Sequence, residues 1–302
     1  MNNKLRAVFF GSGPVALKSL KLLSEYIQLE AIVTKPSTTE TMRHAFPTVP
    51  VYAVSRRAEL DALCLTQNFN SKLGILIDFG VIVDQAAIDS FPLGIINSHF
   101  SLLPELRGVD PITFAILSGQ KETGVSLMVV VRAWDEGPLL AQAKHAIAPD
   151  ATTPSLTDEL IELSNNLLRQ TLPEYAHGKL VPVPQKAGSL LGEDAQATYT
   201  RKLTKEDGQI DWNKPATVLE REIRAYIGWP RSYTTLGGKD VIIHKARVAT
   251  HTGKPGAVQL DHHHLFVCCG EKALEILEIQ PNGKNKMTAS AFIAGYGKQL
   301  EV

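Results

Sequence analysis

The sequence predicts an α/β protein: a Rossmann-like, mostly parallel sheet with helices on both faces, followed by a small C-terminal β-barrel that is OB-like. Two observations support this prediction. The first half alternates apolar strand-like runs with stretches whose apolar residues recur at helical spacing, whereas the last 70 or so residues carry short strands separated by turn residues. The length of 302 residues allows two domains, each with its own core.

In the first half, each apolar run is short enough for a strand and most are followed by an amphipathic stretch. Such alternation is typical of a parallel sheet covered by helices. Gly11-Ser12-Gly13-Pro14 is a turn whose proline suits the first turn of a helix. We expect strands at residues 7–10, 29–33, 73–77, 94–97 and 125–131, and helices at 15–26, 60–67 and 155–171.

The character of the sequence changes near residue 180. Val181-Pro-Val-Pro-Gln185 is typical of an extended connector, so we expect one domain at 1–181, a linker at 182–200 and a second domain at 201–302. Gly-Gly, Pro-Gly and Pro-Asn-Gly turns divide the last part. We expect a helix at 217–225 and strands at 231–236, 241–249, 257–260, 265–269 and 274–279.

Composition excludes several classes of protein. Hydrophobic residues make up 44% and charged residues 21%, as in ordinary globular domains, and no apolar run is long enough for a membrane span or a signal peptide. The three cysteines, two of them adjacent, form no disulfide framework, which favours a reduced cytoplasm. Residues 1–199 hold 16 Lys/Arg against 20 Asp/Glu, and residues 200–302 hold 15 against 11. A mildly basic C-terminal half suits RNA, although chance surface variation explains it equally well.

The N-terminal glycines resemble a dinucleotide-binding fingerprint. Gly11, Gly13 and Ala16 follow a strand and open a helix, which is the context that such a motif requires. The second strand, however, ends in Val-Thr-Lys35 without the acidic residue that binds a ribose, and Glu30 lies near the start of that strand. A nicotinamide cofactor is therefore not expected.

Asn97 and His99 are the first candidates for catalysis. They follow an apolar run and are two residues apart, so in a strand both side chains point to the same face at its carboxyl end, where ligands of α/β sheets collect. An amide can donate a hydrogen bond to a developing oxyanion, and an imidazole can carry a proton, as acyl-type transfer requires. Spacing alone equally allows two turn residues with structural hydrogen bonds.

Asp135 is the third candidate. It lies in Trp134-Asp135-Glu136-Gly137-Pro138, just beyond the strand expected at 125–131. If that strand neighbours the strand of His99, the carboxylate would orient the imidazole. A solvated turn aspartate is the alternative.

The residues around Asn97, His99 and Asp135 also resemble the motif of a known family. Asn97-Ser-His99-x-Ser101-Leu-Leu-Pro104-x-x-Arg107-Gly108-x-x-Pro111-Ile112, with Asp135-x-Gly137-Pro138 after it, is similar to the signature of the folate-dependent formyltransferases. Tyr199-x-x-Lys202-Leu203, Ile210-Asp-Trp212, Trp229-Pro230 and Gln280-Pro-x-Gly283-Lys284 resemble the branch of that family that formylates initiator methionyl-tRNA. The resemblance covers nearly the whole chain.

The resemblance implies transfer of a formyl group from 10-formyltetrahydrofolate to the amine of initiator methionyl-tRNA, by a cytoplasmic monomer without a metal. It assigns His99 as the general base, Asn97 as the oxyanion donor and Asp135 as the residue that supports His99. The implied folate contacts are Phe79, Gly80, Val81, Ile82, Ser101, Leu102, Leu103 and Pro104. The implied acceptor contacts are Gly11, Gly13, Arg107, Lys202 and Arg224. The run His262-His263-His264 is expected to be a hairpin turn.

Three departures from the family pattern leave the acceptor open. The segment 37–44 is shorter and less basic than the family's acceptor-stem loop; Glu105 and Asp110 add negative charge nearby; and Val131 and Ala133 replace the usual aspartate and glycine. Added negative charge weakens attraction for phosphate. An N-formyltransferase acting on a nucleotide-linked amino sugar is therefore the alternative enzyme, and a non-enzymatic RNA- or folate-binding protein is the third hypothesis.

Overall fold

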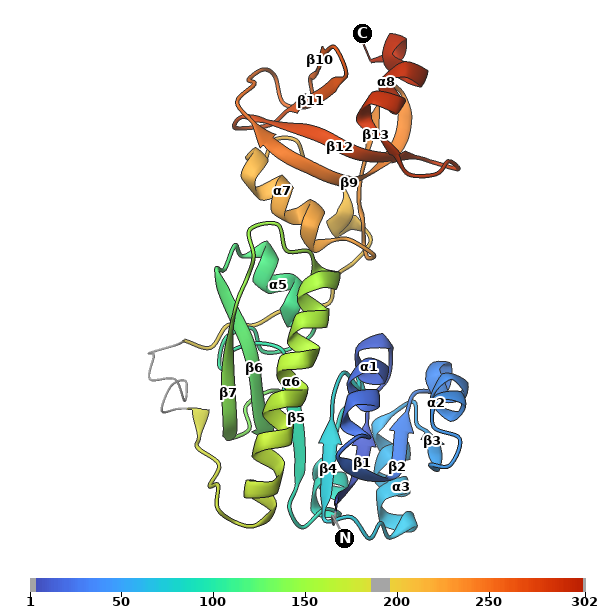
Figure 1. The fold of residues 1–302 in the computed structure, drawn as a ribbon, viewed down its shortest axis with the longest axis vertical. Helices are drawn as coiled ribbons and strands as arrows, with labels where there is room; N and C mark the ends of the chain where they lie inside the picture. Colours follow the sequence, from blue (N-terminus) through green and yellow to red (C-terminus); the bar gives the residue numbers. More distant parts are fainter. Residues whose placement is uncertain (1–3, 186–195, 301–302) are drawn as a thin grey trace. The chain divides into compact units, whose positions relative to one another are not determined.

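A computed structural model describes residues 4–185 and 196–300 of the chain. The chain divides into two compact units (Figure 1). The first comprises Met1–Pro111, Glu122–Ala146 and Thr157–Thr200, and the second Ile112–Lys121, Ile147–Leu156 and Arg201–Val302. The division expected at 1–181, 182–200 and 201–302 remains a prediction.

The first unit is built on a seven-stranded sheet with the order β3-β2-β1-β4-β5-β6-β7. The five strands from β3 to β5 run parallel, and β6 and β7 are antiparallel to their neighbours. The strands are β1 (Leu5–Phe10), β2 (Ile27–Thr34), β3 (Val51–Ala53), β4 (Leu73–Leu76), β5 (Ile95–His99), β6 (Glu122–Val129) and β7 (Leu139–Ala146). The mostly parallel sheet is thus confirmed.

Helices cover both faces of this sheet. They are α1 (Pro14–Leu23), α2 (Thr39–Ala45), α3 (Arg57–Gln67), α4 (Gln85–Asp89) and α6 (Thr153–Ala176), with a 3-10 turn η1 (Pro36–Thr38), whereas α5 (Pro111–Leu117) belongs almost wholly to the second unit. On one face, Leu60 of α3 and Ala87 of α4 pack in a cluster with Phe10 and Val33 of the strands. On the other face, α1 and α6 lie in front of the strands in Figure 1. Two buried faces explain why residues 7–10 of β1 and 31–33 of β2 are continuous apolar runs.

Several elements of this unit escaped the sequence analysis. The sequence of β7 is Leu-Leu-Ala-Gln-Ala-Lys-His-Ala. Because β7 is an edge strand with one solvated face, it lacks the apolar run that marks the inner strands. The segment 37–44, which the family resemblance predicts to be a loop, forms most of η1 and α2, and its Thr39 and Met42 are buried.

The second unit holds a six-stranded antiparallel sheet with the order β10-β11-β12-β9-β8 and with β13 paired to β12. Its elements are η3 (Glu206–Gly208), α7 (Ala216–Ala225), β8 (Ser232–Leu236), β9 (Lys239–Ala249), β10 (Val258–Asp261), β11 (His264–Cys268), β12 (Ala273–Pro281), β13 (Met287–Thr288), α8 (Ala289–Tyr296) and η4 (Gly297–Gln299). The five expected strands are present. β10 and β8 are the edges of this sheet among the described strands, so closure into a barrel is not confirmed.

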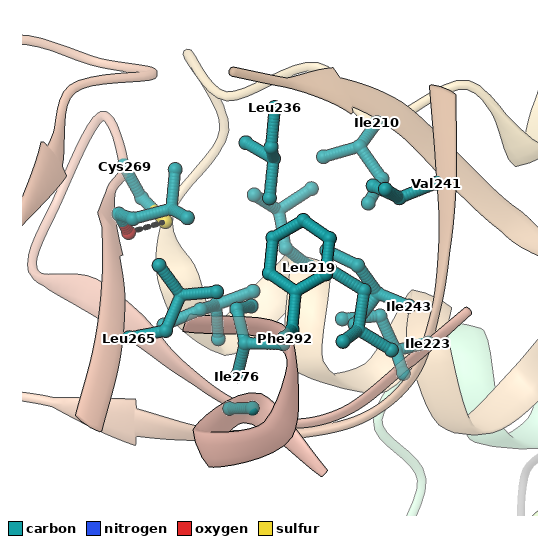
Figure 2. Close-up of a cluster of buried hydrophobic side chains, with 14 of the residues drawn as sticks. Ile210, Leu219, Ile223, Leu236, Val241, Ile243, Leu265, Cys269, Ile276 and Phe292 are labelled. Carbon is teal, nitrogen blue, oxygen red and sulfur yellow. Dashed lines mark hydrogen bonds between the residues drawn. The ribbon is translucent and has the colours of Figure 1, made fainter. Parts of the chain in front are cut away.

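Two helices enclose the core of the second unit. In Figure 2, Leu219 and Ile223 of α7 and Phe292 of α8 meet side chains of four strands, such as Ile243 and Ile276. His262 and His263 form the turn between β10 and β11, as expected, and His264 begins β11. No helix within the described residues is both long and apolar enough to span a bilayer.

Candidate active site

β5 carries two of the three predicted catalytic residues. Asn97 and His99 are 8% and 7% exposed and alternate with Ser98, whose hydroxyl lies 2.7 Å from that of Ser164 on α6. Because side chains alternate along a strand, Ser98 faces α6 while Asn97 and His99 share the opposite face. The predicted side-by-side placement of the amide and the imidazole is therefore present.

Asp135 reaches the same place from the loop between β6 and β7. Its Oδ1 lies 3.5 Å from Asn97 Nδ2, and its Oδ2 lies 3.8 Å from His99 Nδ1. β6 is antiparallel to β5, with Met128 opposite Asn97, so the loop must fold back toward the end of β5 to bring Asp135 there. The three candidates thus gather within a few ångströms of one another.

Backbone groups from the loop after β5 fix this arrangement. The backbone N–H of Gly108 donates to Asp135 Oδ2 at 2.7 Å, and His99 Nε2 lies 2.9 Å from the carbonyl oxygen of Leu106. Since a carbonyl can only accept, Nε2 carries the proton in that hydrogen bond. In the neutral imidazole Nδ1 is then the basic nitrogen, and it faces Asp135.

This geometry suits acyl-type transfer. The Asn97 amide is a donor for a developing oxyanion, and His99 Nδ1 can accept a proton while the Asp135 carboxylate stabilises the resulting imidazolium. The alternative, two unconnected turn residues and a solvated aspartate, does not describe a buried Asn97 and a buried His99 with a partly buried Asp135 within 4 Å of both.

The predicted donor-binding residues lie in two loops of the first unit. The Ser101–Pro104 segment is tied down by polar side chains: Ser126 Oγ accepts from Leu103 N and donates to Ser101 O, and Gln142 donates to Leu103 O. Its Leu103–Pro104 peptide bond is cis. The hydrogen bonds from Ser126 and Gln142 hold this segment at the end of β5.

In the other loop, the four residues 79–82 have different surroundings. The Phe79 ring packs edge-on against Phe10 in the core, so its side chain is turned away from the surface. Gly80 has a positive φ, Val81 is partly buried, and Ile82 is 50% exposed. Ile82 is thus the apolar side chain of this loop with the most surface to offer a ligand.

The predicted acceptor contacts separate into two groups. Gly11 and Gly13 flank Ser12, whose backbone N–H donates to Asp78 O and whose hydroxyl donates to Phe79 O, so this turn lies against the end of β4. Lys202 and Arg224 belong to the second unit.

The cationic residues among the predicted acceptor contacts differ in exposure. Arg107 is 9% exposed and its guanidinium is bonded to Gln185, Tyr199 and Glu136. Arg224 pairs with Glu220 and donates to Ala151 O, whereas Lys202 is exposed. Lys202 is therefore the cation of this set that is open to a partner.

Sequence reasoning did not identify Asp78 as part of this region. A Cβ built on Gly13 would lie 3.2 Å from Asp78 Oδ2, and one built on Gly80 would lie 2.8 Å from Lys35 Nζ, which places both charges against the two glycine turns. Asp78 as a residue is exposed, but desolvation of its carboxyl by the surrounding protein and, secondly, the like charge of Asp110 raise its pKa to about 7, while Lys35 opposes the shift.

Gln185 was also missed. It ends a Pro-rich segment that we interpreted as a connector, yet it is 6% exposed and its amide contacts the Asp135 turn. A polar side chain that follows a proline in an irregular segment gives no periodic signal of burial, so nothing in the sequence distinguishes it. No three metal-ligating side chains gather anywhere in the described parts of the chain.

Comparison with known proteins identifies the family of the chain. The family model "Formyl transferase" matches residues 23–172, and "Formyl transferase, C-terminal domain" matches residues 202–297. A methionyl-tRNA formyltransferase of Chloroflexus aurantiacus is 36% identical over 310 residues, which cover 96% of this chain and 97% of its own.

Two solved structures show the same fold. HypX from Aquifex aeolicus in complex with tetrahydrofolic acid matches with a TM-score of 0.66 at 17% identity, covering 98% of this chain and 48% of HypX, so the chain spans about half the length of that protein. WlaRD, a sugar 3N-formyl transferase solved in the presence of dTDP and 5-N-formyl-THF, matches with a TM-score of 0.66 at 16% identity and is covered completely.

Proposed function

Because the chain belongs to the methionyl-tRNA formyltransferase family, we propose that it transfers the formyl group of 10-formyltetrahydrofolate to the α-amine of initiator methionyl-tRNA. The observation that carries the proposal is the convergence of Asn97, His99 and Asp135, with the carboxylate 3.5 Å from the amide and 3.8 Å from the imidazole.

In the proposed reaction, the acceptor amine attacks the formyl carbon and forms the new C–N bond. The Asn97 amide donates to the formyl oxygen as negative charge develops on it. His99 Nδ1 takes the proton that the amine loses, and Asp135 stabilises the imidazolium. The same proton then passes from His99 to the nitrogen that leaves with the folate, so the imidazole ends the cycle neutral.

The loops around the trio support a donor site. We assign the folate to the surface between the loop 79–82 and the Ser101–Pro104 segment, because ligand sites of this kind combine apolar side chains with a few polar groups that fix the orientation of a flat heterocycle. Gly80 and Leu102 are partly open there, and Ile82 offers an exposed apolar side chain. Phe79 and Leu103 support these loops from the core.

The second unit is proposed to bind the RNA, as an OB-like domain within residues 201–302 that follows a linker at 182–200. Lys202 and Lys284 are exposed cations suited to phosphate contacts, whereas Arg224 is held by Glu220. Gly11 and Gly13 would contact the aminoacyl end of the tRNA. Arg107 would fix the conformation of the loop that follows β5. We propose a cytoplasmic monomer, in keeping with free, reduced cysteines.

An acceptor comparison tests the proposal. Purified protein is incubated with labelled 10-formyltetrahydrofolate and either initiator methionyl-tRNA, elongator methionyl-tRNA or a dTDP-linked amino sugar, with His99→Ala as the inactive control. Formyl-methionyl-tRNA from the initiator species is expected. Formylation of the sugar amine alone would replace the proposal by its alternative, and no transfer to any acceptor would favour a binding protein.

A further inference from the structure

A buried amide links the two loops that hold the catalytic aspartate. Nε2 of Gln185 donates to the carbonyl oxygens of Asp135 and Gly137 at 2.8 Å each. Its Oε1 accepts from Arg107, at 3.2 Å from Nε and 2.7 Å from Nη2. Both N–H donors and both acceptor positions of the Gln185 amide are thus used. The Gln185 side chain is 6% exposed.

Arg107, the partner of Gln185, is itself fixed. Its backbone N–H donates to Thr198 O at 2.9 Å and its carbonyl accepts from Thr200 N at 2.8 Å, while its guanidinium also contacts Tyr199 and Glu136. The Oε1 atom of Gln185 is therefore bonded to Arg107, a residue that is itself held in place. The other end of the amide holds the turn that contains Asp135.

The backbone conformation of Asp135 requires such support. Its φ is 51°, in the left-handed region that a non-glycine residue seldom adopts and keeps only where the surroundings impose it. Its carboxylate, in addition, is bonded to Gly108 N, the residue directly after Arg107. Arg107 and Gly108 thus hold Asp135 twice, once through the carboxylate and once through Gln185.

We propose that Gln185 is a positioning residue, which sets the orientation of Asp135 toward Asn97 and His99 by holding the Asp135–Gly137 turn against Arg107. The inference rests on the proposed function, because it assumes that Asp135 supports His99 during formyl transfer. Gln185 does not touch the reacting atoms. Its removal should therefore change the rate of chemistry and leave the binding of either substrate nearly intact.

Two substitutions separate positioning from simple stability. Gln185→Ala removes the contacts to both loops. Gln185→Glu keeps the size and the contact with Arg107, now as an ion pair, but its carboxylate cannot donate to the carbonyls of Asp135 and Gly137. We expect kcat to fall about 10- to 100-fold in both variants, because small displacements of catalytic groups cost rates of this order, with less than about a threefold change in either KM.

Asn165→Ala is the matched control. Asn165 is 5% exposed, lies on α6 and donates to Ile161 O, so its loss tests the effect of removing a buried amide of the same unit. We expect wild-type kcat for this variant, with a lower melting temperature. The ¹⁵N and ¹H shifts of the His99 ring, measured in the free protein, should move in both Gln185 variants and stay in place in Asn165→Ala.

The outcomes are distinct. If Gln185→Glu folds and retains the wild-type kcat and His99 shifts, Gln185 is only a structural residue and the inference is overturned. If the wild-type protein itself does not formylate methionyl-tRNA, the proposed function fails, but the His99 shifts still report whether Gln185 orients the trio. A fall in kcat with unchanged KM and altered His99 shifts supports the inference.

Discussion

Two aspartates of the first unit have the same backbone conformation and opposite surroundings. Asp78 follows β4 with a φ of 49°, and Asp135 follows β6 with a φ of 51°. Asp135 accepts a hydrogen bond from Gly108 N at 2.7 Å and lies near the Asn97 amide. Asp78 has no side-chain hydrogen bond from any residue described, and its strongest charged neighbour is another carboxylate, Asp110.

The comparison shows that position at a sheet edge does not determine what a carboxylate does. Hydrogen-bond donors aimed at a carboxylate favour its charged form, whereas desolvation and a like charge favour the neutral form. Asp135 has donors and is suited to support a cation on His99. Asp78, whose pKa is raised to about 7, can exchange its proton near neutral pH. The predictions below test this division of roles.

The largest effect is expected from exchanging each carboxylate for an amide. Asp135→Asn keeps the shape but removes the charge that stabilises the His99 imidazolium, so we expect kcat to fall about 10²- to 10⁴-fold, as on loss of proton-transfer catalysis. Asp78→Asn should lower kcat by less than about tenfold. Formyl transfer to methionyl-tRNA at saturating donor measures both.

A comparable loss of kcat in the two variants would contradict the division, since it would make Asp78 part of the chemistry. A fall in kcat/KM of Asp135→Asn that comes entirely from KM would instead make Asp135 a binding residue. Circular dichroism spectra of both variants provide the control for folding.

The second-largest effect is expected from placing another carboxylate next to Asp135, because a carboxylate is the charged neighbour that distinguishes Asp78. Asn97→Asp replaces an amide, 3.5 Å from Asp135, by a second carboxylate and also removes the oxyanion donor. We expect kcat to fall about 10²- to 10³-fold, the usual loss for one such donor. The pH–rate profile should also shift, because the two carboxylates would titrate as a coupled pair.

Asn97→Ala serves as the comparison, since it removes the donor without adding charge. It should lose a similar factor in kcat and keep the wild-type pH dependence. Wild-type rates in either variant would exclude Asn97 from the mechanism.

Most strands of the sheet that carries these residues could be predicted from the sequence. Apolar runs marked β1, β2, β4 and β5 because both faces of those strands are buried, and the i, i+2 spacing of Asn97 and His99 correctly placed them on one face. The family resemblance supplied Asp135 as their partner. These features were predictable because each depends on local pattern or on motif residues.

What could not be predicted depends on contacts between distant segments. The antiparallel direction of β6 and the fold of its loop toward Asn97 leave no trace in local periodicity. Gln185 is 50 residues from Asp135 in sequence, and the hydrogen bond between them follows only from the complete fold. The raised pKa of Asp78 likewise requires Asp110, 32 positions further along the sequence, to be brought near it.

A smaller effect is expected on stability. The pKa of Asp78 is raised from 3.8 in its ordinary state to about 7 in the folded protein, so this group favours folding fully below about pH 4 and the contribution is lost as pH rises through 7. Asp78→Asn removes that dependence. We expect the variant to be more stable than wild type at pH 8, by about 1 kcal/mol once the solvent exposure of the side chain is taken into account, and no more stable at pH 3.8.

Urea unfolding of the wild-type protein and of Asp78→Asn at a series of pH values measures this difference. Asp89→Asn is the control for a change of net charge, because Asp89 lies on α4 and is not among the charges that shift Asp78. A stability difference that does not depend on pH would show that the Asp78 carboxyl does not titrate near neutrality.

The smallest effect concerns the neighbour of Asp78. Asp110→Asn removes the like charge that is the second cause of the raised pKa, while desolvation, the larger cause, remains. The titration midpoint of Asp78 should therefore move down by less than about one pH unit, and it should stay well above the ordinary value. Carboxyl ¹³C shifts of Asp78, followed by NMR from pH 4 to pH 9 in both proteins, measure the midpoint. A midpoint near 3.8 in Asp110→Asn would show that repulsion, and not desolvation, distinguishes Asp78 from Asp135, whereas an unchanged midpoint would remove Asp110 from the account.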